Sequence, residues 1–254
     1  MGESELKNEE ILLYDLRNRP CSFDVVTCVA TSMALGIKHV RFVYGQGFKP
    51  KNYSHKQAIE RWKSIVEPAP SLFGLTYSIG ERQGIEVNHI LRAAIEVYKQ
   101  TGTIGKIPFP CVPRDYVTLT LRKSRNQERD SNEEESRKFA ERCDRKVIII
   151  PDNEDGALSI YDRMKLYAGA YMNLFVINGT GTLCFHSDAP YICMRTIGCE
   201  KSGSTSPASS KANGITPGFQ FPWANANQKL SYLDDTCENM EFEYNEFCSR
   251  RKVA

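Results

Sequence analysis

Short apolar segments alternate along this chain with segments whose apolar residues recur at helical spacing, and this alternation restricts the fold more than any other feature. Strands are predicted over 11–15, 39–44, 75–79, 116–121 and 147–150, in an apolar run that begins at Asn173, and over 191–195. Helices are predicted over 22–36, 54–67, 88–99, 131–142, 161–170 and 237–248, and in a short segment after Gly181. Strands that alternate with helices form mostly parallel sheets, so the predicted fold class is α/β.

Serine, proline and glycine mark the expected ends of these elements. Ser22 and Ser54 are predicted to cap helices, and Pro68 with Pro70 to end the second helix. Residues 199–218, rich in serine, glycine and proline, are predicted to form a mobile loop.

A glycine- and proline-rich segment, residues 101–113, divides the pattern into two halves and is predicted to be a linker. We therefore expect two Rossmann-like parallel-sheet domains, 1–108 and 109–254, that face each other across a cleft. Ligands of open parallel sheets bind outside the carboxyl ends of the strands, so we expect the site in the loops that follow them.

Composition limits the possible partners and compartments. A net charge of +2 argues against a dedicated nucleic-acid binder, and the lack of an apolar run of about 18 residues argues against a membrane span. The N-terminal ten residues are acidic and resemble no export signal. The nine cysteines are odd in number and include no CxxC pair, which favours reduced thiols in the cytoplasm and no metal site.

The sequence Asn178-Gly-Thr-Gly181 joins an apolar strand to a short helix start. Glycines at a strand end allow a sharp turn and close approach by a ligand, and the N–H groups of a helix start favour a phosphate. The motif is neither a Walker loop nor a dinucleotide fingerprint. A tight turn in an α/β core explains it equally well.

The loop from Arg122 to Asn132 follows a strand and precedes a helix. Arg122 and Arg129 could clamp a diphosphate, because a guanidinium offers paired donors in a fixed fork. Ser131 or Asn132 could cap the helix or hold a phosphate oxygen. The alternative is a solvated charged loop with an ordinary cap.

Acidic residues also lie in the first turn of the first predicted helix and after a predicted strand. Asp24 could act as general base for an acceptor hydroxyl, or it could merely stabilise its helix through the dipole. Asp152, with Glu154 and Asp155, could bind a ribose or hydrated Mg²⁺, or form a solvated acidic loop. Among the thiols, Cys21 beside Arg19 is the one with a setting suited to a nucleophile.

Several motifs together resemble proteins of bacterial polysaccharide loci that are similar to GT-B-type glycosyltransferases. The resemblance lies in Thr118-Leu-Thr-Leu-Arg122, Arg129-Asp-Ser-Asn132, Ile150-Pro-Asp152, Tyr167-Ala-Gly-Ala-Tyr-Met-Asn173 leading into Asn178-Gly-Thr-Gly181, Ser22-Phe-Asp24, His39-Val-Arg-Phe-Val43 and Phe221-Pro-Trp223. It implies a GT-B-like fold whose second half holds a nucleotide-sugar donor.

The resemblance also implies roles for single residues. Arg122, Arg129 and Asn132 would hold the donor diphosphate, Gly179, Thr180 and Gly181 would line its pocket, and Asp24 would be the base. Ser131, Asp152 and Asn178 complete the predicted donor-binding set. The expected activity is sugar transfer from a nucleotide-sugar substrate to an acceptor hydroxyl, on a glycan or another molecule, without bound metal or cofactor. Two alternatives remain: a non-catalytic nucleotide- or glycan-binding module of this fold, or another nucleotide-using or base-modifying enzyme.

Overall fold

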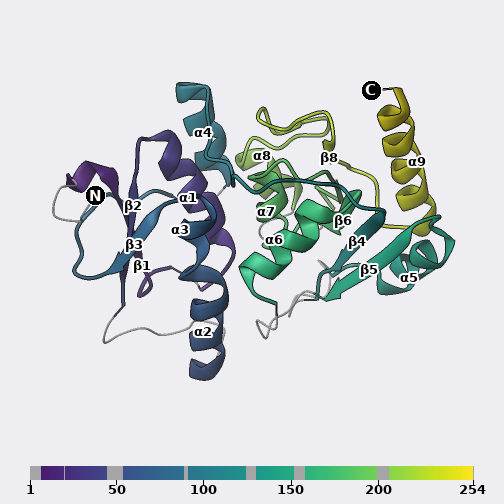
Figure 1. Ribbon diagram of the computed structural model, residues 1–254. Helices are drawn as coiled ribbons and strands as arrows, with labels where there is room; N and C mark the ends of the chain where they lie inside the picture. Colours follow the sequence, from purple (N-terminus) through teal and green to yellow (C-terminus); the bar gives the residue numbers. More distant parts are fainter. Residues whose placement is uncertain are drawn as a thin grey trace. The chain divides into compact units, whose positions relative to one another are not determined.

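The computed structural model describes residues 7–19, 21–44, 54–88, 91–123, 130–151, 158–198 and 206–253 (Figure 1). The chain forms two compact units, one of Met1–Phe109 with Asp155–Arg163 and one of Pro110–Glu154 with Met164–Ala254. Each unit contains its own parallel sheet flanked by helices. The α/β class predicted from the alternating pattern is therefore confirmed.

The first unit contains a three-stranded sheet in the order β1 (Ile11–Asp15), β2 (His39–Val43), β3 (Thr76–Ile79), all parallel. Its helices are listed here in chain order: η2 (Asn8–Glu10), α1 (Asp24–Ala34), α2 (His55–Arg61), η3 (Trp62–Val66), α3 (Ala69–Leu72) and α4 (Leu91–Thr101). Phe42 of β2 packs edge-on against Trp62 of η3, with ring centroids 4.8 Å apart. This contact holds the helical segment after α2 against the sheet.

The predicted helix caps have different outcomes. Ser54 caps α2 as predicted: its hydroxyl accepts the N–H of Gln57, and the Gln57 side chain accepts the N–H of Ser54. Ser22 does not occupy the N-cap position of α1, which is Phe23, but its hydroxyl accepts the N–H of Asp24, the first residue of that helix, at 3.3 Å. The same hydroxyl donates to the Asp24 carboxylate.

The second helical segment ends directly before Pro68, as predicted, but the prediction for Pro70 was wrong. A π-helical turn, Trp62–Val66, follows α2, and α3 then begins at Ala69. Pro70 lies in the first turn of α3. A missing N–H costs little there, because first-turn N–H groups have no partner within the helix.

The second unit contains a five-stranded parallel sheet in the order β5 (Lys146–Pro151), β4 (Tyr116–Leu121), β6 (Met172–Val176), β7 (Tyr191–Met194), β8 (Gln228–Leu230). Counted within the unit, this order is 2-1-3-4-5, a common order of doubly wound α/β sheets. The remaining helices are α5 (Glu133–Arg142), α6 (Ile160–Gly169), α7 (Thr182–Phe185), α8 (Pro207–Ala212) and α9 (Cys237–Val253).

Two elements of this unit were missed in the sequence. The expected mobile loop, 199–218, contains α8, which Ser206 caps through its hydroxyl and which Pro207 opens. Serine at the cap and proline at the first position are helix-start signals as well as loop signals. Strand β8 is three residues long and is defined by its pairing with β7.

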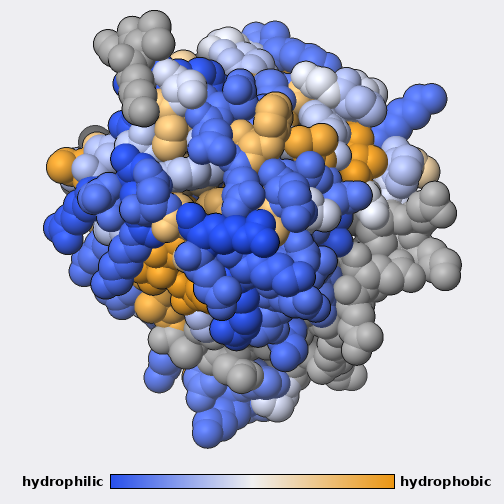
Figure 2. All heavy atoms as spheres, turned by 90° about the vertical axis from the view of Figure 1, so that its right-hand side faces the viewer, coloured by the Kyte–Doolittle hydropathy of each residue, from blue (hydrophilic) through white to orange (hydrophobic). Residues whose placement is uncertain are grey.

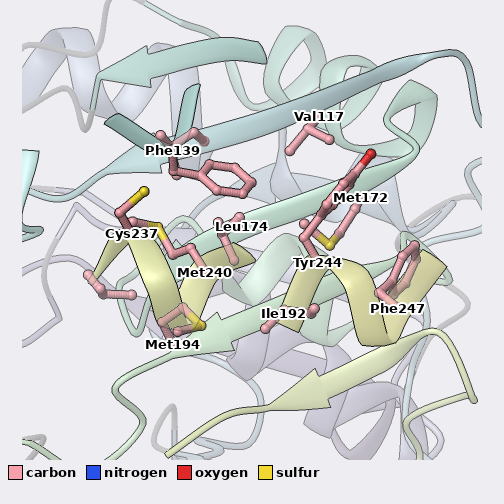
Figure 3. Close-up of a cluster of buried hydrophobic side chains, with 12 residues drawn as sticks. Val117, Phe139, Met172, Leu174, Ile192, Met194, Cys237, Met240, Tyr244 and Phe247 are labelled. Carbon is pink, nitrogen blue, oxygen red and sulfur yellow. The ribbon is translucent and has the colours of Figure 1, made fainter. Parts of the chain in front are cut away.

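One face of the second sheet packs against α5 and α9 through apolar side chains (Figure 3). Phe139 of α5 and Phe247 of α9 are both buried in this cluster. The cluster comprises Val117, Leu119, Phe139, Met172, Leu174, Val176, Ile192, Met194, Cys237, Met240, Tyr244 and Phe247. The outer surface of these helices is mainly hydrophilic, with small apolar patches (Figure 2).

The opposite face of the same sheet contains polar side chains that are hydrogen-bonded. Thr118 of β4 and Asn173 of β6 are register partners, and the threonine hydroxyl donates to the Asn173 side-chain oxygen at 2.5 Å. The Asn173 amide in turn donates to the carbonyls of Tyr167 and Pro190, at 2.9 and 2.7 Å. These bonds attach α6 and the start of β7 to this face. No helix among the described residues is long and apolar enough to span a membrane.

Two phenylalanines on α9 test the importance of the apolar face. Phe247→Ala should lower the free energy of unfolding by about 3–5 kcal/mol, because it leaves a cavity in the core. Phe242, 55% exposed on the same helix, is the matched control. Phe242→Ala should change stability by less than about 0.5 kcal/mol in the same denaturant titration. Equal losses in both variants would contradict this account of the core.

Candidate functional site

The carboxyl ends of β4 and β6 meet where the order of the second sheet reverses. β4 lies between β5 and β6, and α5 and α6 lie on opposite faces of the sheet. The chain that leaves β4 passes through α5 to β5 on one side, and the chain that leaves β6 passes through α7 to β7 on the other. In open α/β sheets, ligands bind outside the strand ends at such a switch point.

Arg122 lies at this edge, directly after β4. Its Nη1 donates to the carbonyl oxygen of Ile177, which follows β6, at 2.6 Å. Its own N–H donates to the Ser131 hydroxyl at 2.8 Å, and the Ser131 N–H donates back to the Arg122 carbonyl at 3.0 Å. One cationic side chain thus connects the segments after both strands, and Ser131 fixes its backbone.

The turn after β6 is organised around the side chain of Asn178. Its Oδ1 accepts from the Thr180 hydroxyl at 2.9 Å and from the Gly181 N–H at 2.8 Å. The residue is only 6% exposed, and its Nδ2 has no hydrogen-bond partner among the described residues. A buried amide donor without a partner is costly, and a ligand oxygen would satisfy it.

Thr180 continues this turn into the sheet. The Tyr167 hydroxyl of α6 lies 3.4 Å from the Thr180 hydroxyl and 2.9 Å from that of Thr120 in β4. Thr180 and Thr120 are 2% and 1% exposed. The buried hydroxyls of Thr120, Tyr167 and Thr180 therefore connect the turn after β6 to β4 and α6.

The two glycines have different environments. A Cβ on Gly181 would lie 2.6 Å from a ring carbon of Phe175, so close packing requires glycine there. Gly179 is exposed and accepts the Thr182 hydroxyl at its carbonyl, 2.7 Å away. The N–H groups of Gly181, Thr182 and Leu183 all donate within the turn, and α7 has four residues. In this conformation, these three N–H groups at the start of α7 are therefore already hydrogen-bonded and are not available to a phosphate.

Asn132 caps α5, one of the two possibilities that the sequence left open. Its side chain accepts the N–H of Glu135 at 3.3 Å, and its own N–H donates to Asp235 at 2.7 Å. Its side chain is exposed, beside the segment that carries Ser131. Arg129 and Asp152, the other predicted donor-binding residues, lie outside the described residues, as do Glu154 and Asp155.

Asp24 belongs to the first unit and is the first residue of α1. It is half-buried, and its carboxylate accepts the Ser22 hydroxyl at 2.8 Å. The predicted donor residues belong to the second unit. The helix-dipole and general-base interpretations of Asp24 both stay predictions.

No protein-family model matches this sequence, and no curated protein does either. Among solved structures, the chain is similar to the bacterial iron-containing dodecameric glycosyltransferase TibC from enterotoxigenic E. coli. The TM-score is 0.47 and the sequence identity is 13%, with 87% of this chain and 63% of the other covered. This chain thus spans less than two thirds of that protein. At this level of likeness, function has to be argued from the residues themselves.

Sequence reasoning missed Arg195 and Asp235 at the same edge. Arg195 follows β7, and its guanidinium lies 3.4 Å from the Asp235 carboxylate, which is buried before α9. The criterion that selected Arg122, a charged residue directly after an apolar strand, would also have selected Arg195. Asp235 carries no such signal, because its partners come from distant parts of the chain.

The Cys21 thiol does not suit nucleophilic chemistry, and the buried imidazole of His186 carries no charge. Burial raises the pKa of the Cys21 thiol to about 11, so it is protonated at neutral pH and a poor nucleophile. Burial lowers the pKa of His186 to about 3, so the ring is neutral. No group of three or more potential His, Cys, Asp or Glu ligands occurs in the part of the chain that the structure describes.

His186 should make the protein sensitive to mild acid. The unfolded chain binds a proton near pH 6.5, whereas the folded ring does so only near pH 3. Folding stability therefore decreases as the pH falls below about 6.5, by up to about 1.4 kcal/mol per pH unit. His186→Phe, which keeps a ring beside Trp223, should make the decrease between pH 6.5 and 5 shallower in urea titrations. An unchanged pH dependence would show that this imidazole is not the titrating group.

Proposed function

We propose that the second unit binds the diphosphate of a nucleotide sugar at the edge between β4 and β6, and that the protein transfers the sugar to an acceptor hydroxyl. The observation that carries this proposal is the Arg122 guanidinium, which bridges the segments after both strands through the Ile177 carbonyl. A cation at a topological switch point suits an anionic ligand. The Asn178 amide, one residue from Ile177, has no partner for its Nδ2 in the part of the chain that the structure describes, and it would supply a second donor of the kind that a phosphate oxygen accepts.

The chemistry of sugar transfer explains why such donors matter. When the bond between the sugar and the diphosphate breaks, negative charge develops on the leaving phosphate oxygen. Fixed donors that hold this charge lower the barrier more than they strengthen ground-state binding. Arg122 would supply the positive charge, and Asn178, Thr180 and the adjoining glycines would line the pocket.

The remaining predicted residues complete the proposal. Arg129, Ser131, Asn132 and Asp152 belong to the donor-binding set, and Asp24 of the first unit would accept the proton of the acceptor hydroxyl. In a GT-B-like protein of this kind, residues 1–108 would form the acceptor side and residues 109–254 the donor side. The acceptor would be a glycan or another hydroxyl compound of polysaccharide synthesis in the cytoplasm.

Replacement of Arg122 tests the donor site. Arg122→Ala should weaken the binding of UDP or GDP by about 10- to 100-fold in isothermal titration calorimetry, since charge-assisted hydrogen bonds contribute about 1.5–3 kcal/mol. Arg137→Ala is the matched control: Arg137 lies on α5 of the same unit, 59% exposed and paired with Glu133. Equal affinity of Arg122→Ala and wild-type protein would reject the diphosphate clamp.

Replacement of Asp24 tests the catalytic part separately. The wild-type protein should slowly hydrolyse at least one of a panel of UDP-, GDP- and CMP-sugars. Asp24→Asn should then reduce transfer to an acceptor by about 10²- to 10⁴-fold while nucleotide affinity stays the same. If Asp24 serves only the helix dipole, the Asp24→Asn variant will lose stability but keep its turnover. Nucleotide binding without turnover in the wild-type protein would instead indicate the non-catalytic binding module.

A further inference from the structure

Arg195 has a strained backbone at the carboxyl edge of the second sheet. Its φ is 47°, and no other non-glycine residue among those described has a positive φ. L-residues rarely adopt this conformation, because it brings the Cβ atom close to the following carbonyl oxygen. Arg195 follows β7 directly, so the strain lies at the strand end, where the loop begins. Such strain persists only where surrounding contacts offset it.

The side chain of Arg195 makes those contacts. Its Nη2 donates to the Asp130 carbonyl at 2.5 Å, and its Nη1 lies 3.4 Å from Asp235 Oδ1. The other oxygen of Asp235 accepts the Asn132 N–H at 2.7 Å. Asp235 is 5% exposed and the Arg195 side chain 19%, so water screens this pair only partly.

Gly198 further restricts the position of Arg195. A Cβ on Gly198 would lie 2.4 Å from the Arg195 Cγ. The turn therefore closes over the arginine stem only because residue 198 is glycine. The backbone conformation, two polar partners and this close approach all fix the guanidinium in one position.

The contacts of Arg195 lead step by step to Arg122. Arg195 binds the Asp130 carbonyl directly, and Asp235 links it to the Asn132 N–H. Asp130 and Asn132 are the two chain neighbours of Ser131. Ser131 in turn makes two hydrogen bonds to the Arg122 backbone. Arg195 itself is bound to protein groups on both terminal nitrogens. Its charge therefore acts on the segment after β4.

We propose that Arg195 is a positioning residue of the diphosphate site: with Asp235 it anchors residues 130–132 and thereby holds Arg122 for an anionic ligand. This inference rests on the proposed function. It assigns to β7 and the segment before α9 a part in a site otherwise built from the ends of β4 and β6. The strained backbone of Arg195 allows its guanidinium to contact the Asp130 carbonyl and Asp235.

The test uses Arg195→Gly, Asp235→Ala and the double variant of the full chain. Glycine removes the guanidinium without adding backbone strain, since it adopts positive φ freely. Titration with UDP, GDP and pyrophosphate should show each single variant weakened by about 5- to 150-fold, the usual range for coupling between sites. The double variant should be no weaker than either single one, because both act through the same segment. Arg195→Lys should restore part of the affinity.

A direct phosphate contact by Arg195 makes the opposite prediction. Asp235→Ala would then release the guanidinium and leave affinity unchanged or higher, which would overturn the positioning role. Arg142→Ala is the matched control, because Arg142 forms an ion pair with Glu241 in the same unit, 3.6 Å apart. It should leave binding of all three ligands unchanged.

Hydrogen exchange separates this inference from the proposed function. Without ligand, the amides of Ser131 and Asn132 should exchange faster in Arg195→Gly than in wild-type protein and in Arg142→Ala. If exchange is unchanged, or if Arg195→Gly binds ligand as wild type does, the positioning role is wrong. If wild-type protein binds none of the three ligands, the proposed function fails, and the affinity claim for Arg195 fails with it.

Discussion

Parallel pairing of β4 with β6 is the constraint on which the proposed site depends. Parallel strands end at the same edge, so the segments after them meet although Arg122 and Ile177 are 55 residues apart in the chain. Arg122 can therefore reach the Ile177 carbonyl, and Ser131 can return to the Arg122 backbone. The neighbouring strand β7 brings Arg195 to this edge as well. Among the described residues of the proposed donor site, Arg122, Ser131 and Asn178 all depend on this shared edge.

The two faces of the second sheet differ in the side chains that they bury. The face under α5 and α9 is apolar and forms a buried hydrophobic cluster with these helices. The face under α6 contains Thr118, Thr120 and Asn173, which would be costly if left unpaired. Their hydrogen bonds to one another and to Tyr167 satisfy them, and the same hydroxyl chain reaches Thr180 in the turn after β6. Polar residues of the core thus support the turn that carries Asn178.

Local sequence was most informative at a helix end whose hydrogen-bonding partners are close together in the chain. The capping box of Ser54 and Gln57 was predictable, because both partners lie within one turn. Pro70 and the serine-rich stretch before α8 were misinterpreted, because proline and serine favour helix starts as well as loops. Strand β8 could not be predicted from Gln228, Lys229 and Leu230, since its pairing with β7 alone makes it a strand.

By itself, the sequence determined the alternation of strands and helices, the parallel class of both sheets and the position of Arg122 at a strand end. These follow from periodicity and from the chain neighbours of each residue. Only the tertiary structure decided the strand order 5-4-6-7-8, the contact of Arg122 with Ile177 and the pairing of Arg195 with Asp235. The physical reason is that partners far apart in the chain are brought together by sheet pairing and core packing, which local pattern does not encode.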